Sequence, residues 1–263
     1  MAKDPTSAKG VDPGEIRVGL DLGGTKIYGA VFGEKWKVLG TARRPTEGHR
    51  GAEAGVDRMV DVVLDALSDA GVDIREVGSI GVGCPGVVDM KAGVLRSTPN
   101  LGWPDVKLKE VLGKRLGCRV EVFNDVDSGT YGEYVAGAGK GARSVLGVFP
   151  GTGIGAGYVY DGRLLRGRRY SAMEIGRMRW PAPGLANPVG EWPNFESFCS
   201  RLAVASAAAA EGFRGNAPAL MKKSGTDISK IKSKAIAMSY EAGDQGTVRV
   251  VENALDYLCA GIG

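Results

Sequence analysis

The hydrophobic and polar positions at the start of the chain follow first a strand period and then a helix period. Short apolar runs over 16–22, 26–32 and 37–44 predict three β-strands that form a meander. Over 52–70 the apolar side chains recur every three or four positions, which predicts an amphipathic helix that ends at Gly71. This helix is expected to cover the sheet.

The order of strand, turn and strand returns in the second half of the chain. The first half closes with a predicted strand over 77–83, a helix over 106–117 and a strand over 118–125. The second half predicts a helix over 126–139, strands over 144–150 and 154–162, and helices from Asn194 onward. This repeated organisation predicts two lobes. We expect a flexible segment at 1–15, an N-terminal α/β lobe at 16–124 and a C-terminal α/β lobe at 125–263 that is helical toward its end.

Composition narrows the class of protein. The 263 residues could form one large domain or two ordinary ones, and 42 glycines indicate many tight turns. Lys and Arg outnumber Asp and Glu by only 34 to 30, so the charge does not indicate a nucleic-acid partner. No signal sequence and no run of about 18 apolar residues is present, which predicts a cytoplasmic protein without a membrane partner. Four scattered cysteines and one histidine, His49, favour buried thiols over disulfides and make a Cys/His cluster hard to build.

Two glycine-rich turns are the first candidates for chemistry. They occur in "LDLGGTKI" and "FPGTGIGAG", each after a predicted strand. A Walker A loop is absent, and the GxGxxG pattern over 81–86 is followed by "VVDMKAG", which does not predict the helix that a dinucleotide fold needs. "GTGIGAG" also runs into a predicted strand, so dinucleotide binding is disfavoured.

Either turn alone could be an ordinary hairpin turn. Unshielded backbone N–H groups in two such turns could instead cradle a phosphate chain, and the presence of both favours this interpretation. Gly23, Gly24 and Thr25 would form one side, and Gly151, Thr152 and Gly153 the other.

Asp125 is the candidate general base for a phosphoryl transfer. It follows the predicted strand "CRVEVF" and could orient and deprotonate a hydroxyl group. An aspartate at the end of a strand could equally cap the helix that follows. The residues alone leave both roles open.

An ordered set of motifs resembles the ROK family of sugar kinases and sugar-responsive repressors over nearly the whole chain. The motifs are "LDLGGTKI", "CPGVVD", "PNLGW", "FNDVDSGTYGEY", "GAGKGARSVLGVFPGTGIGAGYVYDGRLLRG" and "EIG". The resemblance implies an α/β, two-lobed, actin-like ATPase fold of the hexokinase type, which is ribonuclease H-like. A sugar and a nucleotide would lie in the interdomain cleft.

The resemblance also implies roles for particular residues, with ATP and Mg²⁺ as cofactors. Asp125 would be the catalytic base. The sugar would contact Asn100, Asn124, Asp125, Glu174 and Glu196, with Arg177 beside it. The nucleotide phosphates would lie against Asp21, Gly23, Gly24, Thr25, Lys26, Gly151, Thr152 and Gly153.

The sequence departs from the family pattern in three places. "EIGR" replaces "EIGH", so Arg177 stands where the family has a histidine. "PAPGLANPVGEWPN" replaces a cysteine-rich loop, so no structural zinc is expected. The chain also ends before the segment that supplies much of the family's adenosine pocket. The stretch around Arg177 is strongly basic, which favours either a solvated loop or an anionic ligand such as a phosphosugar or polyphosphate; it contains Arg163, Arg166, Arg168, Arg169, Arg177 and Arg179.

The sequence therefore predicts an ATP-dependent, glucokinase-like hexose kinase with Asp125 as general base. One alternative is a catalytically impaired sugar-binding or sugar-sensing ROK protein, and another is a kinase that uses polyphosphate or a phosphosugar. A DNA-binding repressor is disfavoured because only about 15 residues precede the first strand, too few for a helix-turn-helix. The expected partners are a sugar and a nucleotide, and homodimerisation is left open.

Overall fold

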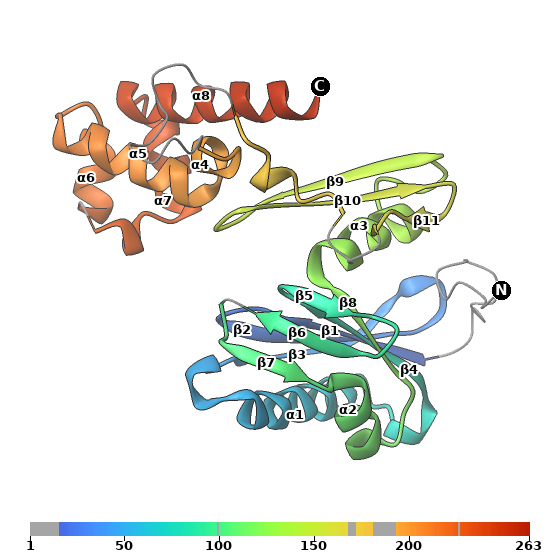
Figure 1. Cartoon of the computed structure of the whole chain (residues 1–263). Helices are drawn as coiled ribbons and strands as arrows, with labels where there is room; N and C mark the ends of the chain where they lie inside the picture. Colours follow the sequence, from blue (N-terminus) through green and yellow to red (C-terminus); the bar gives the residue numbers. More distant parts are fainter. Residues whose placement is uncertain (1–15, 99, 168–171, 181–192, 226) are drawn as a thin grey trace. The chain divides into compact units, whose positions relative to one another are not determined.

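The computed structural model describes residues 16–98, 100–167, 172–180, 193–225 and 227–263. The chain forms two compact units (Figure 1). Unit 1 combines residues 1–147 with 157–172, and unit 2 combines 148–156 with 173–263. The predicted lobe boundary after residue 124 stays a prediction.

A five-stranded mixed sheet is the centre of unit 1, and its strand order is β3-β2-β1-β4-β8. The strands are β1 (Ile16–Leu22), β2 (Lys26–Phe32), β3 (Val38–Pro45), β4 (Val77–Cys84) and β8 (Val120–Asn124). Strands β1, β4 and β8 run parallel, whereas β2 is antiparallel to both of its neighbours. All five strands were predicted within about two residues.

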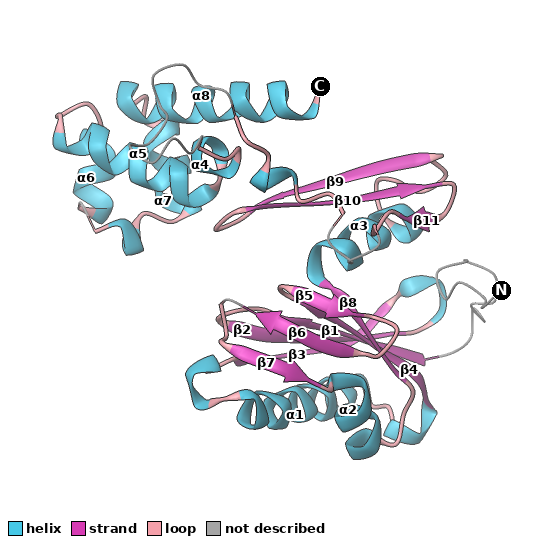
Figure 2. Cartoon of the chain, viewed as in Figure 1, coloured by secondary structure: helices cyan, strands magenta, loops and turns pink. Residues whose placement is uncertain are grey.

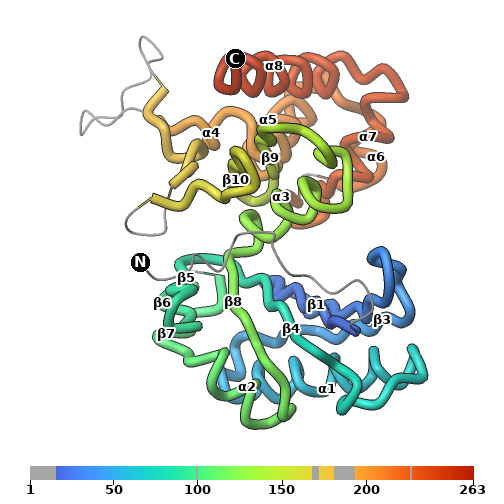
Figure 3. Tube along the Cα trace, turned by 90° about the vertical axis from the view of Figure 1, so that its right-hand side faces the viewer, coloured from blue at the N-terminus to red at the C-terminus, as the bar shows by residue number. Residues whose placement is uncertain are grey.

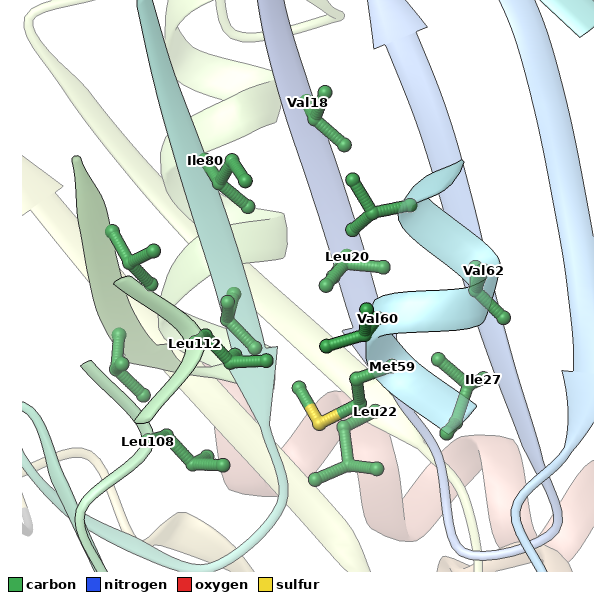
Figure 4. Packing of buried hydrophobic residues seen from close by; sticks show 14 of the residues in the cluster. Val18, Leu20, Leu22, Ile27, Met59, Val60, Val62, Ile80, Leu108 and Leu112 are labelled. Atoms are coloured by element: carbon green, nitrogen blue, oxygen red, sulfur yellow. The ribbon is translucent and has the colours of Figure 1, made fainter. Parts of the chain in front are cut away.

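Two helices pack on one face of this sheet (Figures 1 and 3): α1 (Ala52–Ala70) and α2 (Leu108–Leu116). The apolar stripe of α1 is buried, as its period predicts, and Gly71 ends the helix with φ +66°. Met59 of α1 and Ile80 of β4 are fully buried (Figure 4). Leu112 of α2 joins the same core. The packing of α1 and α2 therefore fixes the sheet whose strand ends carry the candidate site.

A second sheet in unit 1 was not predicted. It has the order β5-β6-β7 and consists of β5 (Val87–Asp89), β6 (Val94–Thr98) and β7 (Trp103–Val106). Its strands are antiparallel and only three to five residues long, so they are too short to show an alternating pattern. Strand β5 directly follows the GxGxxG match, which confirms that no helix opens there.

The strand, turn and strand of the second half are present (Figure 2). Helix α3 (Asp125–Ala136) follows β8 without a loop. The third sheet has the order β11-β10-β9, with β9 (Ser144–Pro150), β10 (Ile154–Tyr160) and β11 (Arg163–Leu164). The described part of unit 1 also contains the 3₁₀ turns η1 (Glu34–Trp36), η2 (Gly48–Arg50) and η3 (Ile74–Glu76).

Helices dominate the rest of unit 2, as predicted from Asn194 onward. They are η4 (Ile175–Arg177), α4 (Glu196–Cys199), α5 (Arg201–Phe213), α6 (Pro218–Ser224), η5 (Ile228–Lys230), α7 (Ser233–Glu241) and α8 (Gln245–Ile262). Buried alanines of α5 form a small core with α6 and α7, and Phe195 centres a second one. None of the described helices combines the length and apolar character that a membrane span requires.

Candidate functional site

The carboxyl ends of β1, β4 and β8 bring three predicted site residues to one edge of the sheet. Asp21 pairs in register with Gly83, and Cys84 pairs with Asn124. Asp125 follows Asn124 and begins α3. Asp21 lies across β4 from Phe123, so Asp125 is two strands over from Asp21 and two residues further along the chain. In open α/β sheets this carboxyl edge is where ligands bind.

The first glycine turn continues directly from β1. Gly23 N–H donates to Lys26 O at 2.9 Å, which closes the hairpin between β1 and β2. A Cβ on Gly23 would stand 2.7 Å from Lys26 O, so no other residue fits there without a shift of the backbone. Asn100 lies beside the turn, because a Cβ on Gly24 would be 3.7 Å from Asn100 Cβ. The structure therefore places Asn100 next to the predicted phosphate turn.

Asn124 supports both the helix and the loop around it. Its Oδ1 accepts from Asp127 N–H at 3.1 Å and so caps α3. Its Nδ2 donates to Gly86 O at 3.1 Å. The structure thus assigns Asn124 a positioning contact that the sequence did not indicate, and its contact with sugar stays a prediction.

Asp125 does not cap α3, because Asn124 does. It is half-buried in the first turn of the helix, and its Oδ1 accepts from Val126 N–H at 2.9 Å. Burial raises the pKa of the Asp125 carboxyl above its usual value, and the negative charge of Asp21 raises it further. A carboxylate with a raised pKa is a stronger proton acceptor, which suits a general base.

Burial also raises the pKa of Asp21, while the neighbouring Lys26 ammonium opposes this effect. Cys84 lies between the two carboxylates on the middle strand and is fully buried. Its burial, with the negative charges of Asp125 and Asp21, raises the pKa of its thiol far above the usual range. Cys84 is therefore a neutral packing residue, and the titrating groups of this edge are the two aspartates.

The second glycine turn lies in unit 2 and joins β9 to β10. Gly151 N–H donates to Gly153 O at 2.8 Å. The Glu196 carboxylate packs against this turn, because its Oε2 accepts from Ile154 N–H at 3.1 Å. A side chain on Gly153 would collide with that carboxylate. Glu196 therefore holds the turn, and the sugar contact predicted for it stays a prediction.

Arg201 is a basic residue at this turn that sequence reasoning missed. It is the first residue of α5, its N–H donates to Gly151 O at 2.9 Å, and its Nη2 donates to Thr152 Oγ1 at 3.3 Å. Because Thr152 and Arg201 are 49 positions apart, no local pattern could have joined them. The contact adds a positive charge to the second predicted phosphate turn.

Glu174 and Arg177 form an ion pair, with 3.3 Å between Arg177 Nε and Glu174 Oε2. Both side chains are exposed, at 54% for Glu174 and 75% for Arg177. Gly176 between them is buried, and a Cβ there would collide with Ile154 O. The "EIG" segment is thus packed against the start of β10.

The basic stretch is only partly described. The Arg166 guanidinium lies 5.9 Å from the centre of the Phe123 ring, next to Asn124 in sequence. Arg168 and Arg169 lie outside the described residues, as does most of the loop over 178–194 for which no zinc is expected. Within the described part of the chain, no three His, Cys, Asp or Glu side chains gather closely enough to hold a metal ion.

A mixed sheet with glycine turns after its strands and an aspartate at its carboxyl edge defines the class of actin-like ATPases, and the solved structures that the chain resembles share this fold. The chain belongs to the ROK family, whose model matches residues 17–263. The predicted fold class and the predicted family are both confirmed.

The relatives of this chain include glucokinases and N-acetyl-D-glucosamine kinases. The chain is 33% identical to the Streptomyces coelicolor glucokinase over 189 residues, which is 72% of this chain and 57% of that protein. It is 30% identical to the Thermotoga maritima glucokinase over 93% of this chain and 76% of that protein. The structure of a ROK family glucokinase from Streptomyces griseus, in complex with glucose and AMPPNP, superposes with a TM-score of 0.79. That match has 31% identity and covers 94% of this chain and 78% of the other.

Proposed function

We propose that the protein is a sugar kinase that transfers the γ-phosphoryl group of ATP to a hexose hydroxyl. The observation that carries this proposal is the arrangement at the carboxyl edge of unit 1. There a backbone turn built from glycines follows β1, and Asp125, an aspartate with a raised pKa, follows β8, in a chain of the ROK family. Its glucokinase relatives support the same reaction class.

In this reaction Asp125 accepts the proton of the sugar hydroxyl. The hydroxyl oxygen bonds to the γ-phosphorus, the bond from that phosphorus to the β,γ-bridging oxygen breaks, and ADP leaves. Asp125 then returns its proton to solvent. The raised pKa of Asp125 helps the first step because it increases the driving force for proton transfer.

Each of the two glycine turns is proposed to bind donor phosphates through backbone N–H groups. In unit 1 this role belongs to the turn of Gly23, Gly24 and Thr25, in which Gly23 shapes the turn because its N–H already donates to Lys26 O, and Lys26 supplies a positive charge. In unit 2 it belongs to the turn from Gly151 to Gly153, in which Gly151 N–H already donates to Gly153 O, and Arg201 lies beside this turn. Arginine binds phosphate oxygens through its planar fork of donors, so Arg201 suits an oligophosphate.

The residues present fit Mg²⁺. Asp21 and Asp125 are hard oxygen ligands at one edge of the sheet, and each has a pKa raised by its surroundings. Mg²⁺ bound with ATP commonly takes one or two protein carboxylates and keeps several waters. When bound, the ion would neutralise the charge of the β- and γ-phosphates. Asp21 is the residue that would face it, while Asp125 acts on the sugar.

The residues proposed to contact the sugar are Asn100, Asn124, Asp125, Glu174 and Glu196. Amide and carboxylate side chains suit a ring with several hydroxyl groups, because each can bind two hydroxyls at once. The Glu174–Arg177 ion pair alters this set, since it engages one of these carboxylates. This ion pair favours a hexose other than plain glucose. The same contact supports the two alternatives, a phosphosugar substrate and an impaired sugar-binding protein.

A phosphorylation assay tests the proposal. The purified protein is incubated with Mg²⁺ and a panel that includes glucose, mannose, N-acetylglucosamine and their monophosphates, with ATP in one arm and polyphosphate in the other. We expect one hexose to be phosphorylated with ATP. Binding of a sugar without turnover by either donor would favour the impaired sugar-binding alternative, and product only in the polyphosphate arm would replace ATP as donor.

A further inference from the structure

Thr46 is a fully buried polar residue that no motif in the sequence indicates. It follows β3 directly, and its exposed fraction is 0%. Both of its donors reach the first glycine turn. Its Oγ1 donates to Gly23 O at 2.7 Å, and its N–H donates to Thr25 O at 3.0 Å. One residue thus holds the carbonyl groups on both sides of Gly24.

These two bonds fix the direction in which the turn presents its own donors. The described peptide bonds are all trans, and a trans peptide points its C=O and the following N–H in opposite directions. Since Gly23 C=O points at the Thr46 hydroxyl, the N–H of Gly24 points away from Thr46. Gly24 and Thr25 are both exposed. The N–H of Gly24 therefore points away from the buried Thr46, toward the exposed side of the turn, where an anion can approach.

A glycine turn needs such an anchor from outside itself. Gly23 and Gly24 lack a Cβ and can adopt many conformations, so a ligand that binds them would have to order the turn. The bond from Gly23 N–H to Lys26 O closes the hairpin but leaves the peptide between Gly23 and Gly24 free to rotate. Of the side-chain hydrogen bonds within the described chain, that of Thr46 is the one that reaches this peptide.

We propose that Thr46 is a positioning residue for the donor. Its hydroxyl holds the turn from Gly23 to Thr25 in the orientation that binds an oligophosphate chain. The inference rests on the proposed function, since that function assigns the donor phosphates to this turn. It predicts that loss of the hydroxyl weakens donor binding and leaves sugar binding unchanged.

The variants Thr46→Val and Thr46→Ser separate the hydroxyl from the shape of the side chain. Valine keeps the branched shape and loses the donor, whereas serine keeps the donor and loses a methyl group. Binding of a non-hydrolysable ATP analogue with Mg²⁺ is measured by calorimetry, because this readout does not require turnover. We expect Kd to rise about tenfold in Thr46→Val, the size of one lost hydrogen bond, and to stay within about twofold of wild type in Thr46→Ser.

Thr247→Val is the matched control for a general loss of stability. Thr247 is also fully buried, and its hydroxyl pairs with that of Ser239 at 2.7 Å, in unit 2. We expect this control to lower the melting temperature and to leave Kd for the analogue unchanged. Titration of the preferred hexose should give the same Kd for wild type and for both Thr46 variants.

Three results would overturn the inference: an unchanged analogue Kd in Thr46→Val, equal weakening by valine and serine, or no analogue binding by the wild type. Failure of the proposed function is a separate result. A wild type that binds the analogue but phosphorylates no hexose would refute the kinase reaction, while the comparison of Kd values would still decide the role of Thr46.

Discussion

The proposed chemistry of the candidate site depends first on one residue, Asp125. Its neighbours decide what it can do: Asn124 takes over the capping of α3, and burial raises the pKa of the Asp125 carboxyl. An aspartate at a strand end is often structural. Here the structural task is performed by the residue before it, so the carboxylate of Asp125 is available for catalysis.

Asp125→Asn should lower kcat by a factor on the order of 10² to 10⁴, the usual contribution of a general base, while sugar binding is retained. Asparagine has the same shape but cannot accept the proton of the hydroxyl. Steady-state kinetics and calorimetric titration of the sugar measure the two effects. Asp256→Asn, at an exposed aspartate of α8, is the control and should have wild-type kcat. Wild-type turnover in Asp125→Asn would remove this residue from the mechanism.

The pH dependence of kcat/KM should also report Asp125. The base works only when deprotonated, so activity is lost as the pH falls through the raised pKa of Asp125. Because Asp21 contributes to that raised value, Asp21→Asn should lower the pKa of Asp125 and move the acidic limb of the profile to lower pH. The maximum value of kcat/KM should also fall in Asp21→Asn, since Asp21 would face the metal. An acidic limb that stays in place would show that another group controls it.

At the scale of elements, the short turn η4 brings together the two charged side chains that are proposed to lie beside the sugar. The element η4 is a single 3₁₀ turn, and side chains three positions apart lie over one another in such a turn. Glu174 and Arg177 are therefore brought together by the backbone itself. Their ion pair is exposed, so it is worth only about 0.2–1 kcal/mol and can be rearranged by a ligand.

Arg177→His should improve the binding or the phosphorylation of plain glucose. The substitution removes a permanent positive charge and frees Glu174 to accept from a sugar hydroxyl. The kcat/KM for glucose is compared between wild type and variant, with Arg179→His, an exposed neighbour, as the control. Efficient use of glucose by the wild type, without improvement in Arg177→His, would show that the arginine does not influence the substrate.

At the scale of the whole molecule, stability should come from packed cores and not from a bound metal. Among the described residues, unit 1 has one large apolar cluster and unit 2 has two smaller ones. The loop over 178–194 contains no cysteine or histidine. We therefore expect metal analysis of the purified protein to find no stoichiometric zinc, and chelators to leave its melting temperature unchanged. One tightly held zinc per chain would refute the interpretation of this loop.

The sequence by itself determined the strands of the main sheet, the helix α1 that covers it, and their order along the chain. Periods of two and 3.6 residues, with glycines at the turns, predicted the five strands of the main sheet and helix α1, because these patterns are local. The short strands β5, β6 and β7 were missed, since three to five residues are too few to establish a period. The motifs identified the family and the candidate residues.

Only the tertiary structure decided which residues support the site. Thr46 reaches Gly23 across 23 positions, Arg201 reaches Thr152 across 49, and Glu196 reaches Ile154 across 42. It also decided that Asn124 caps α3 in place of Asp125. The physical reason is that hydrogen bonds form between groups that are close in space. Strand pairing and helix packing bring distant segments together, and a local pattern of side chains does not predict these long-range contacts.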